Sequence, residues 1–318
     1  MNIYSLNDIL NLLPIGYKVE GSTNDISFDN VKPIEEANER SLVWIKGKKE
    51  NKQELVEKTL AKTIICDPNL LINKKLSKQK CFIIVSDPKL TFLRIAEHFF
   101  VHKKKYGVHV SAIIDPEAEI SPNSYIGPLT YIGKSKIGEN TFIDGNCFIY
   151  DDVIIGNNVR VQAGTVIGSD GYGYQRNENM VFEKFPHIGG VVIEDNVDIG
   201  SNTCIDRGAL GDTIIKEGAK IDNLVHVAHN VVIGKHCAVI ANAMLGGSVI
   251  IADYSWVAPS ASILNQVSIG ENVTVGMAAV VTKNIPDGET WAGVPARPLK
   301  EFIETQKAIK NLTRRQEL

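Results

Sequence analysis

The segment IKEGAKIDNLVHVAHNVVIGKHCAVIANAMLGGSVIIADYSWVAPSASILNQVSIGENVTVGMAAVV (215–281) decides the fold, because a branched aliphatic residue stands at every sixth position. The positions are Ile215, Ile221, Val227, Ile233, Val239, Leu245, Ile251, Val257, Ile263, Ile269, Val275 and Val281. A period of six fits neither an amphipathic helix nor a strand whose residues alternate between two faces. It predicts a solenoid of short parallel strands whose aliphatic side chains share one core.

The same period extends toward the N-terminus, with isoleucine or valine every six residues over 114–132, 137–167 and 193–205. Glycine, aspartate and asparagine gather at the turn positions between the repeats, where unusual backbone angles are tolerated. Two stretches interrupt the period, at 168–190 and 206–213. Loops that leave a regular solenoid are where binding residues tend to lie, so we expect the functional site near these two insertions.

Three regions follow from this pattern. Residues 1–105 are predicted to form a small α/β domain, 106–285 the β-helix, and 286–318 a tail whose helix begins near Leu299. In the first region the strand-like runs are 25–28, 42–45, 62–66 and 81–85, and the helical stretches are 52–61 and 86–100. The predicted fold class is therefore mainly β, a parallel β-helix between a small α/β domain and a C-terminal helix.

Composition excludes several classes of protein. The 318 residues are 44% hydrophobic and 22% charged, with a net charge of −3, so no basic excess indicates a dedicated nucleic-acid binder. The five cysteines form no C-x-x-C pair, which indicates reduced thiols in the cytoplasm and no structural metal site. We expect neither a signal peptide nor a membrane span, since no apolar run approaches the ~20 residues that a span requires.

Three motifs, IGSDGYGY (167–174), IDRGALGDTII (205–215) and KIDNLVHVAHNVVIG (220–234), follow an N-terminal α/β domain in that order. This combination resembles the UDP-3-O-acylglucosamine N-acyltransferases of lipid A and lipopolysaccharide biosynthesis, over nearly the whole chain. The resemblance implies a left-handed parallel β-helix that assembles as a homotrimer. It also implies transfer of an acyl group, such as 3-hydroxyacyl, from an acyl carrier protein or coenzyme A thioester to a sugar amine, with no further cofactor.

The resemblance also assigns roles to residues. It makes His229 of the AHN motif the general base and Gly247 the oxyanion donor, and it places Asp222 and Asn223 in the same groove. The repeat is compatible with these roles, because His229 lies two residues after the core position Val227 and should project outward. A sugar amine must be neutral to attack a thioester, and a histidine can accept its proton near neutral pH.

Other positions depart from the family pattern. Gln266 stands where some relatives have a second histidine, and Trp44 stands where the family stacks a phenylalanine on uracil. Trp44 can still stack on a pyrimidine, and Lys46 can reach a diphosphate. Tyr172 and Tyr174 are candidates for the wall of the sugar or acyl pocket. The substrate is therefore expected to be UDP-3-O-acylglucosamine or an amino deoxysugar linked to UDP or dTDP.

Two alternatives use the same solenoid. Trimeric β-helix carbonic anhydrases bind zinc through three histidines, and this chain offers His226, His229 and His236, although at a different spacing. The second alternative is a non-catalytic scaffold that binds partners through its flat faces.

Overall fold

The computed structural model describes residues 3–13, 16–24, 26–101 and 105–315. The chain divides into two compact units, residues 1–104 and 105–318.

The first unit is a small α/β domain. Its five-stranded sheet has the order β2 (Lys18–Gly21), β7 (Cys81–Ile84), β6 (Thr63–Cys66), β5 (Ser41–Trp44) and β4 (Asn30–Val31). The helices are α1 (Leu6–Leu10), α2 (Lys52–Lys58), α3 (Lys74–Gln79) and α4 (Pro88–Phe99), and β1 (Tyr4–Ser5) pairs with β3 (Ser27–Phe28). All pairs in the larger sheet are parallel except β2 with β7.

The predicted helix over 86–100 is confirmed as α4. Asp87 is its N-cap and accepts a hydrogen bond from the Leu90 amide, and Pro88 opens the first turn, where its missing N–H leaves no partner unpaired. Helix α3 was not predicted from the sequence, because its six residues, KKLSKQ, contain one apolar side chain and show no periodicity.

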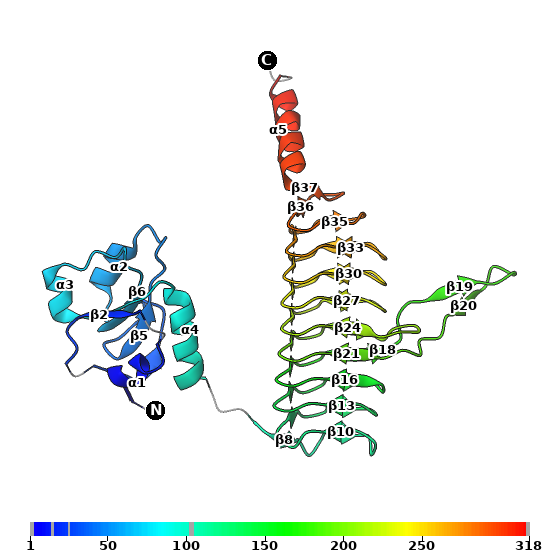
Figure 1. Ribbon diagram of the computed structural model, residues 1–318, viewed down its shortest axis with the longest axis horizontal. Helices are drawn as coiled ribbons and strands as arrows, with labels where there is room; N and C mark the ends of the chain where they lie inside the picture. The colour runs from blue at the N-terminus through cyan, green and yellow to red at the C-terminus, as the bar shows by residue number, and fades with distance from the viewer. Residues whose placement is uncertain (1–2, 14–15, 25, 102–104, 316–318) are drawn as a thin grey trace. The chain divides into compact units, whose positions relative to one another are not determined.

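The second unit is a β-helix built from three sheets, whose strands pair in parallel except for β36 with β37 (Figure 1). The β10 sheet contains β10 (Glu119–Ile120), β13 (Lys136–Ile137), β16 (Val153–Ile155), β21 (Val191–Ile193), β24 (Thr213–Ile215), β27 (Val232–Ile233), β30 (Ile250–Ile251) and β33 (Ser268–Ile269). The β9 sheet contains β9 (Ile113–Ile114), β12 (Tyr131–Ile132), β15 (Phe148–Ile149), β18 (Val166–Ser169), β23 (Cys204–Asp206), β26 (His226–Val227), β29 (Met244–Leu245), β32 (Ser262–Ile263) and β35 (Val280–Val281). The β8 sheet contains β8 (Gly107–Val108), β11 (Tyr125–Ile126), β14 (Phe142–Ile143), β17 (Arg160–Val161), β22 (Asp198–Ile199), β25 (Lys220–Ile221), β28 (Ala238–Val239), β31 (Trp256–Val257), β34 (Thr274–Val275), β36 (Thr290–Ala292) and β37 (Arg297–Pro298).

The hexad aliphatics form the core of this unit, as predicted. None of the twelve positions between Ile215 and Val281 is more than 3% exposed. Strands pair with the strand one coil earlier, so that Ile221 lies beside Val239 and Val227 beside Leu245, eighteen residues apart. Asparagine recurs at turn positions with a left-handed backbone, as at Asn230 with φ 59°, a conformation that its short polar side chain tolerates. The predicted fold class, a left-handed parallel β-helix with an α/β domain before it and a helix after it, is confirmed.

Both interruptions leave the coil at the corner between the β9 and β10 sheets. The first forms an antiparallel hairpin, β19 (Tyr174–Arg176) and β20 (Phe182–Lys184), which projects sideways from the stack in Figure 1. The second is a short loop between β23 and β24. Helix α5 (Leu299–Arg315) follows the last coil and begins at the expected residue. Within the described part of the chain, no helix combines the length and apolar character needed to cross a membrane.

Candidate active site

His229 lies at the corner between the β9 and β10 sheets, in the turn from β26 to β27. The side chain is partly buried, and its Nδ1 atom lies 3.1 Å from Oδ1 of Asn230. Two further hydrogen bonds fix the orientation of the Asn230 amide. Oδ1 accepts from the Ala209 backbone at 2.9 Å, and Nδ2 donates to the Gly211 carbonyl at 3.0 Å. The second insertion therefore holds the amide that contacts His229.

This arrangement selects one tautomer of the imidazole. Because Oδ1 of Asn230 can only accept a hydrogen bond, the Nδ1 atom of His229 carries the hydrogen. A neutral imidazole with hydrogen on Nδ1 has its lone pair on Nε2. Nε2 is thus the atom available to accept a proton from a substrate.

Gly247 lies one coil after His229 and faces its Nε2 atom. A Cβ atom built on Gly247 would lie 2.7 Å from Nε2 and 2.8 Å from Cε1 of His229, so a side chain here would displace the imidazole. The Gly247 amide makes no hydrogen bond within the described residues, whereas its carbonyl accepts from the Gln266 amide at 2.9 Å. The structure therefore brings the two predicted catalytic residues together, with a free N–H on the glycine.

Gln266 follows one coil further along the same edge. Its side chain is exposed, and its backbone lies in the left-handed region at φ 62°. The backbone hydrogen bond to Gly247 places it next in the column of turns that starts at His229.

Asp222 and Asn223 lie at a different corner, between β25 of the β8 sheet and β26 of the β9 sheet. Oδ2 of Asp222 accepts a hydrogen bond from the Ala241 amide, and Oδ1 of Asn223 accepts one from the Ser201 amide. Both side chains therefore connect neighbouring coils. Within one chain, the contact to Nδ1 of His229 comes from Asn230 and not from Asp222.

Sequence reasoning missed two residues beside His229. His187, at the end of the first insertion, is only 6% exposed, and its ring centroid lies 5.3 Å from that of His229. Asp206, at the end of β23, is also 6% exposed. Asp206 stands in the quoted motif IDRGALGDTII, but nothing in the sequence linked His187 to His229. Only the path of the insertion brings them together.

The surroundings of Asp206 perturb its acidity. Its Oδ1 accepts from the Ser169 hydroxyl at 3.2 Å, and Oδ2 lies 3.8 Å from Nε2 of His226. Burial raises the pKa of Asp206 above its ordinary value, and the nearby His226, Ser169, His229 and His187 oppose that rise. A carboxyl group and three imidazoles therefore share one electrostatic neighbourhood at this corner.

Both predicted tyrosines lie in the first insertion, Tyr174 at the start of β19 and Tyr172 just before that strand. Tyr172 is 84% exposed and Tyr174 is 45% exposed, and their ring centroids are 4.9 Å apart. At the base of the hairpin Lys184 pairs with Asp170, and this hydrogen bond lowers the pKa of Asp170. The tyrosines thus form an uncovered aromatic pair on the insertion that also carries His187.

Trp44 and Lys46 line one cavity of about 590 Å³ in the α/β domain. Phe92 lies on the same cavity, with its ring centroid 6.2 Å from that of Trp44. Lys49 also lines it and pairs with Glu35 at 2.9 Å. An aromatic wall beside lysine side chains suits a planar base that carries phosphate groups.

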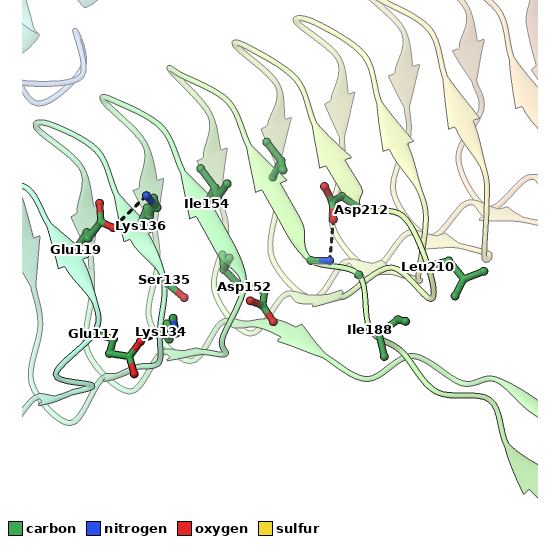
Figure 2. Close-up of a pocket in the computed structure, with 14 residues that line it drawn as sticks. Glu117, Glu119, Lys134, Ser135, Lys136, Asp152, Ile154, Ile188, Leu210 and Asp212 are labelled. Atoms are coloured by element: carbon green, nitrogen blue, oxygen red, sulfur yellow. Dashed lines mark hydrogen bonds and ion pairs between the residues drawn. The ribbon is translucent and has the colours of Figure 1, made fainter.

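A groove of about 440 Å³ runs along the outer face of the β10 sheet (Figure 2). Ion pairs link Glu119 to Lys136 and Glu117 to Lys134 across it. Ile188 and Leu210, each 70% exposed, line the groove from the two insertions. The second insertion therefore borders the groove through Leu210 and contacts Asn230 through Ala209 and Gly211.

The three histidines of the zinc alternative do not come together within the chain, because only His226 and His229 lie near Asp206. His226 lies on β26 and faces Asp206, whereas His236 lies at another corner and stacks on Tyr254 with ring centroids 5.5 Å apart. Among the described residues, no group of three or more histidine, cysteine, aspartate or glutamate side chains is arranged to hold a metal ion.

Part of the chain is similar to known acyltransferases. Residues 134–169 match the family described as bacterial transferase hexapeptide (six repeats). The chain is 40% identical over 165 residues to a UDP-3-O-acylglucosamine N-acyltransferase of Methylobacterium nodulans, covering 52% of this chain and 47% of that protein. It is 45% identical over 150 residues to the protein of the same name from Caulobacter sp. strain K31, covering 47% and 44%. The resemblance found in the sequence is thus confirmed over about half of the chain rather than nearly all of it, and the chain spans less than half the length of these relatives.

Solved structures support the same fold. The UDP-N-acetylglucosamine acyltransferase of Francisella novicida has a TM-score of 0.56 and 28% identity, covering 60% of this chain and 69% of that one. The UDP-N-acetylglucosamine acyltransferase from Campylobacter jejuni has a TM-score of 0.55 and 28% identity, covering 60% and 73%.

Proposed function

We propose that this chain is an N-acyltransferase that moves an acyl group, such as 3-hydroxyacyl, from a thioester to the amine of a nucleotide-linked amino sugar. The proposal is carried by one observation: Nε2 of His229 faces Gly247, whose amide has no hydrogen-bond partner among the described residues, and Asn230 holds the imidazole in the tautomer with a lone pair on Nε2. The names of the relatives support acyl transfer to a UDP-linked sugar.

The reaction needs two groups that this corner supplies. The amine nitrogen attacks the thioester carbonyl carbon, an N–C bond forms, and Nε2 of His229 accepts the proton that the amine loses. The carbonyl oxygen becomes an oxyanion, and the Gly247 amide donates a hydrogen bond to it. When the C–S bond breaks, the thiolate leaves and takes the proton back from His229. No cofactor is required beyond the acyl thioester of an acyl carrier protein or coenzyme A.

The nucleotide is assigned to the cavity beside Trp44. We assign base stacking to Trp44 and contact with the diphosphate to Lys46. UDP should therefore bind the wild-type chain, and Trp44→Ala should weaken that binding by about tenfold or more. Trp256→Ala is the matched control, since Trp256 lies 48% exposed on β31 of the β8 sheet. Equal UDP affinity in the two variants, measured by calorimetry, would contradict this assignment.

The active enzyme is assigned as a cytoplasmic homotrimer. Five outward aliphatic side chains lie in register on the β10 sheet: Ile154, Val192, Ile214, Val232 and Ile250. Ile154 is 47% exposed and Ile250 is 49% exposed, and we assign this stripe to the contact with a second copy of the chain. A neighbouring copy can then bring Asp222 and Asn223 to the groove beside His229. Native mass spectrometry of Ile214→Asp should show loss of the trimer.

The activity is tested by incubating the full chain with UDP- or dTDP-linked amino sugars and 3-hydroxyacyl thioesters. Release of free thiol, together with an amide product of the expected mass, supports the proposal. His229→Ala should lose about 10²-fold or more in kcat. His236→Ala should keep the wild-type rate, because His236 lies at another corner. No thiol release with any pair, or full activity in His229→Ala, would reject the function.

A further inference from the structure

In the part of the chain that the structure describes, the buried imidazole of His187 has one nitrogen without a hydrogen-bond partner. Nδ1 lies 3.0 Å from the Phe185 carbonyl oxygen, which only accepts, so Nδ1 carries the hydrogen. In a neutral ring Nε2 is then an acceptor. Nε2 is buried, and no donor among the described residues reaches it. A buried acceptor left unpaired costs free energy, so its retention calls for an explanation.

The unpaired nitrogen lies beside His229. The two rings meet edge to face at 75°, with their centroids 5.3 Å apart. Gly171 fills the remaining space between them. A Cβ atom built on Gly171 would lie 3.0 Å from Nε2 of His187 and 3.0 Å from both Cβ and Cδ2 of His229. Nε2 of His187 and the Cδ2 edge of His229 therefore line the same narrow space, which admits only a glycine.

Charged groups surround this pair on several sides. Asp206 of β23 contributes a buried carboxyl group, and His226 of β26 lies 3.8 Å from it. On the insertion, Asp170 is paired with Lys184. Arg207 is paired with Asp152 at 3.1 Å. Each of those two ion pairs joins one positive and one negative side chain and therefore carries no net charge. A proton on His229 therefore has two groups beside it that favour a positive charge, the lone pair of His187 and the carboxyl of Asp206.

We propose that His187 is a positioning residue for His229, holding one side of its imidazole and stabilising its protonated form through the unpaired Nε2. The inference rests on the proposed function, in which His229 must accept a proton and then release it. A neutral His187 suits this role, because a second positive charge at this distance would repel the protonated His229.

The proposal is tested by the pH dependence of carbethoxylation at His229. Diethyl pyrocarbonate modifies only the neutral imidazole, and peptide mass spectrometry of the full chain separates His229 from other sites. His187→Phe keeps a buried ring but removes Nε2. In this variant, carbethoxylation of His229 should reach half its maximal rate at a pH about half a unit to one unit lower than in the wild type. His187→Gln keeps an acceptor oxygen, and its midpoint should stay within about 0.3 unit of the wild type.

The matched control is His236→Gln, which alters a histidine at another corner of the coil, where it stacks on Tyr254. It should leave the midpoint at His229 unchanged. An unshifted midpoint in His187→Phe, or equal shifts in His187→Phe and His236→Gln, would overturn the proposal. If His187→Phe does not fold, His187→Leu supplies the same comparison.

Kinetics provide the second readout. In an active chain, His187→Phe should lower kcat by about tenfold and change KM by less than about twofold, because the residue acts on the base and not on the substrate. The carbethoxylation experiment needs no substrate. Absence of acyl transfer would therefore reject the proposed function while the shift at His229 still decides the role of His187.

Discussion

The side-chain oxygen of Asn230 lies 3.1 Å from Nδ1 of His229 and accepts a hydrogen bond from the Ala209 amide at 2.9 Å. One amide group therefore joins the second insertion to the imidazole at the corner of the coil. Because the two bonds to the insertion fix which end of the amide faces the ring, the tautomer of His229 depends on that loop.

Replacing Asn230 should separate orientation from chemistry. We expect Asn230→Ala to lower kcat by roughly ten- to a hundredfold, because the imidazole loses its fixed tautomer. Hydrogen exchange at the Ala209 amide should become faster in the same variant. Asn242→Ala is the control, since Asn242 has a similar left-handed backbone at φ 62° and its side chain bonds to Ser260, not to an imidazole. If the two variants lose kcat equally, backbone strain and not the imidazole contact explains the effect.

Gly247→Ala tests the closeness of the glycine to the base. The added methyl would lie 2.7 Å from Nε2 of His229, so the ring must move and kcat should fall by about 10²-fold. Gly211→Ala is a matched change in the adjoining loop, where the nearest atom lies 4.0 Å from the added Cβ. Steady-state kinetics with the best substrate pair compare kcat of the two variants. A small decrease of kcat in Gly247→Ala would contradict the close approach of Gly247 to His229.

Asp206→Asn should change the pH dependence of stability. Since burial raises the pKa of Asp206, the folded chain holds this proton more tightly than the unfolded chain does. The stability that this proton contributes is lost as the pH rises from about 4, the ordinary pKa of aspartate, through the higher pKa of Asp206 in the folded chain. The melting temperature of Asp206→Asn relative to wild type should therefore increase from pH 4 to pH 8.

Asp170 supplies a comparison of opposite sign. Its pairing with Lys184 lowers the pKa of Asp170, so its contribution is present above the unfolded value and is lost as the pH falls through the folded value. Compared with the wild type, Asp170→Asn should accordingly lose most folding stability at neutral pH and least in acid. The same trend for both aspartate variants would mean that the burial of Asp206 does not govern its acidity.

The hexad core can be tested with two neighbouring residues. Ile263 is fully buried, and Ile263→Ala should cost about 2–5 kcal/mol of unfolding free energy. Leu264, its neighbour, is 50% exposed, and Leu264→Ala should cost about 0.5 kcal/mol or less. Chemical denaturation followed by circular dichroism measures both, and similar losses would argue against the inward ladder.

Thiol chemistry should distinguish Cys204 from the other cysteines. Burial raises the pKa of Cys66 to about 12 and the pKa values of Cys81, Cys147 and Cys237 to about 11. Cys204 is exposed on β23, although burial raises its pKa too. Iodoacetamide at pH 8 should therefore alkylate Cys204 first, while the other four react only on unfolding. Peptide mass spectrometry reads the sites, and early modification of Cys237 would contradict the packing of the coil.

The aliphatic ladder from Ile215 to Val281 determined the β-helix from sequence alone, because a period of six leaves no other regular structure able to bury these side chains together. The structure places Gly247 one coil from His229, since eighteen residues return the chain to the same corner. Periodicity carries this information because each coil repeats the backbone path of the one before.

The neighbours that tune His229 were decided only by the tertiary structure. His187 and Ala209 lie in the two insertions, where the repeat stops and no period relates position in the sequence to position in space. Their approach to His229 depends on the path of each loop. In the first insertion, Gly171 leaves room between the rings of His187 and His229. The second insertion is held by hydrogen bonds to Asn230. Such contacts join residues 19 or more positions apart without any shared pattern, so three-dimensional packing alone establishes them.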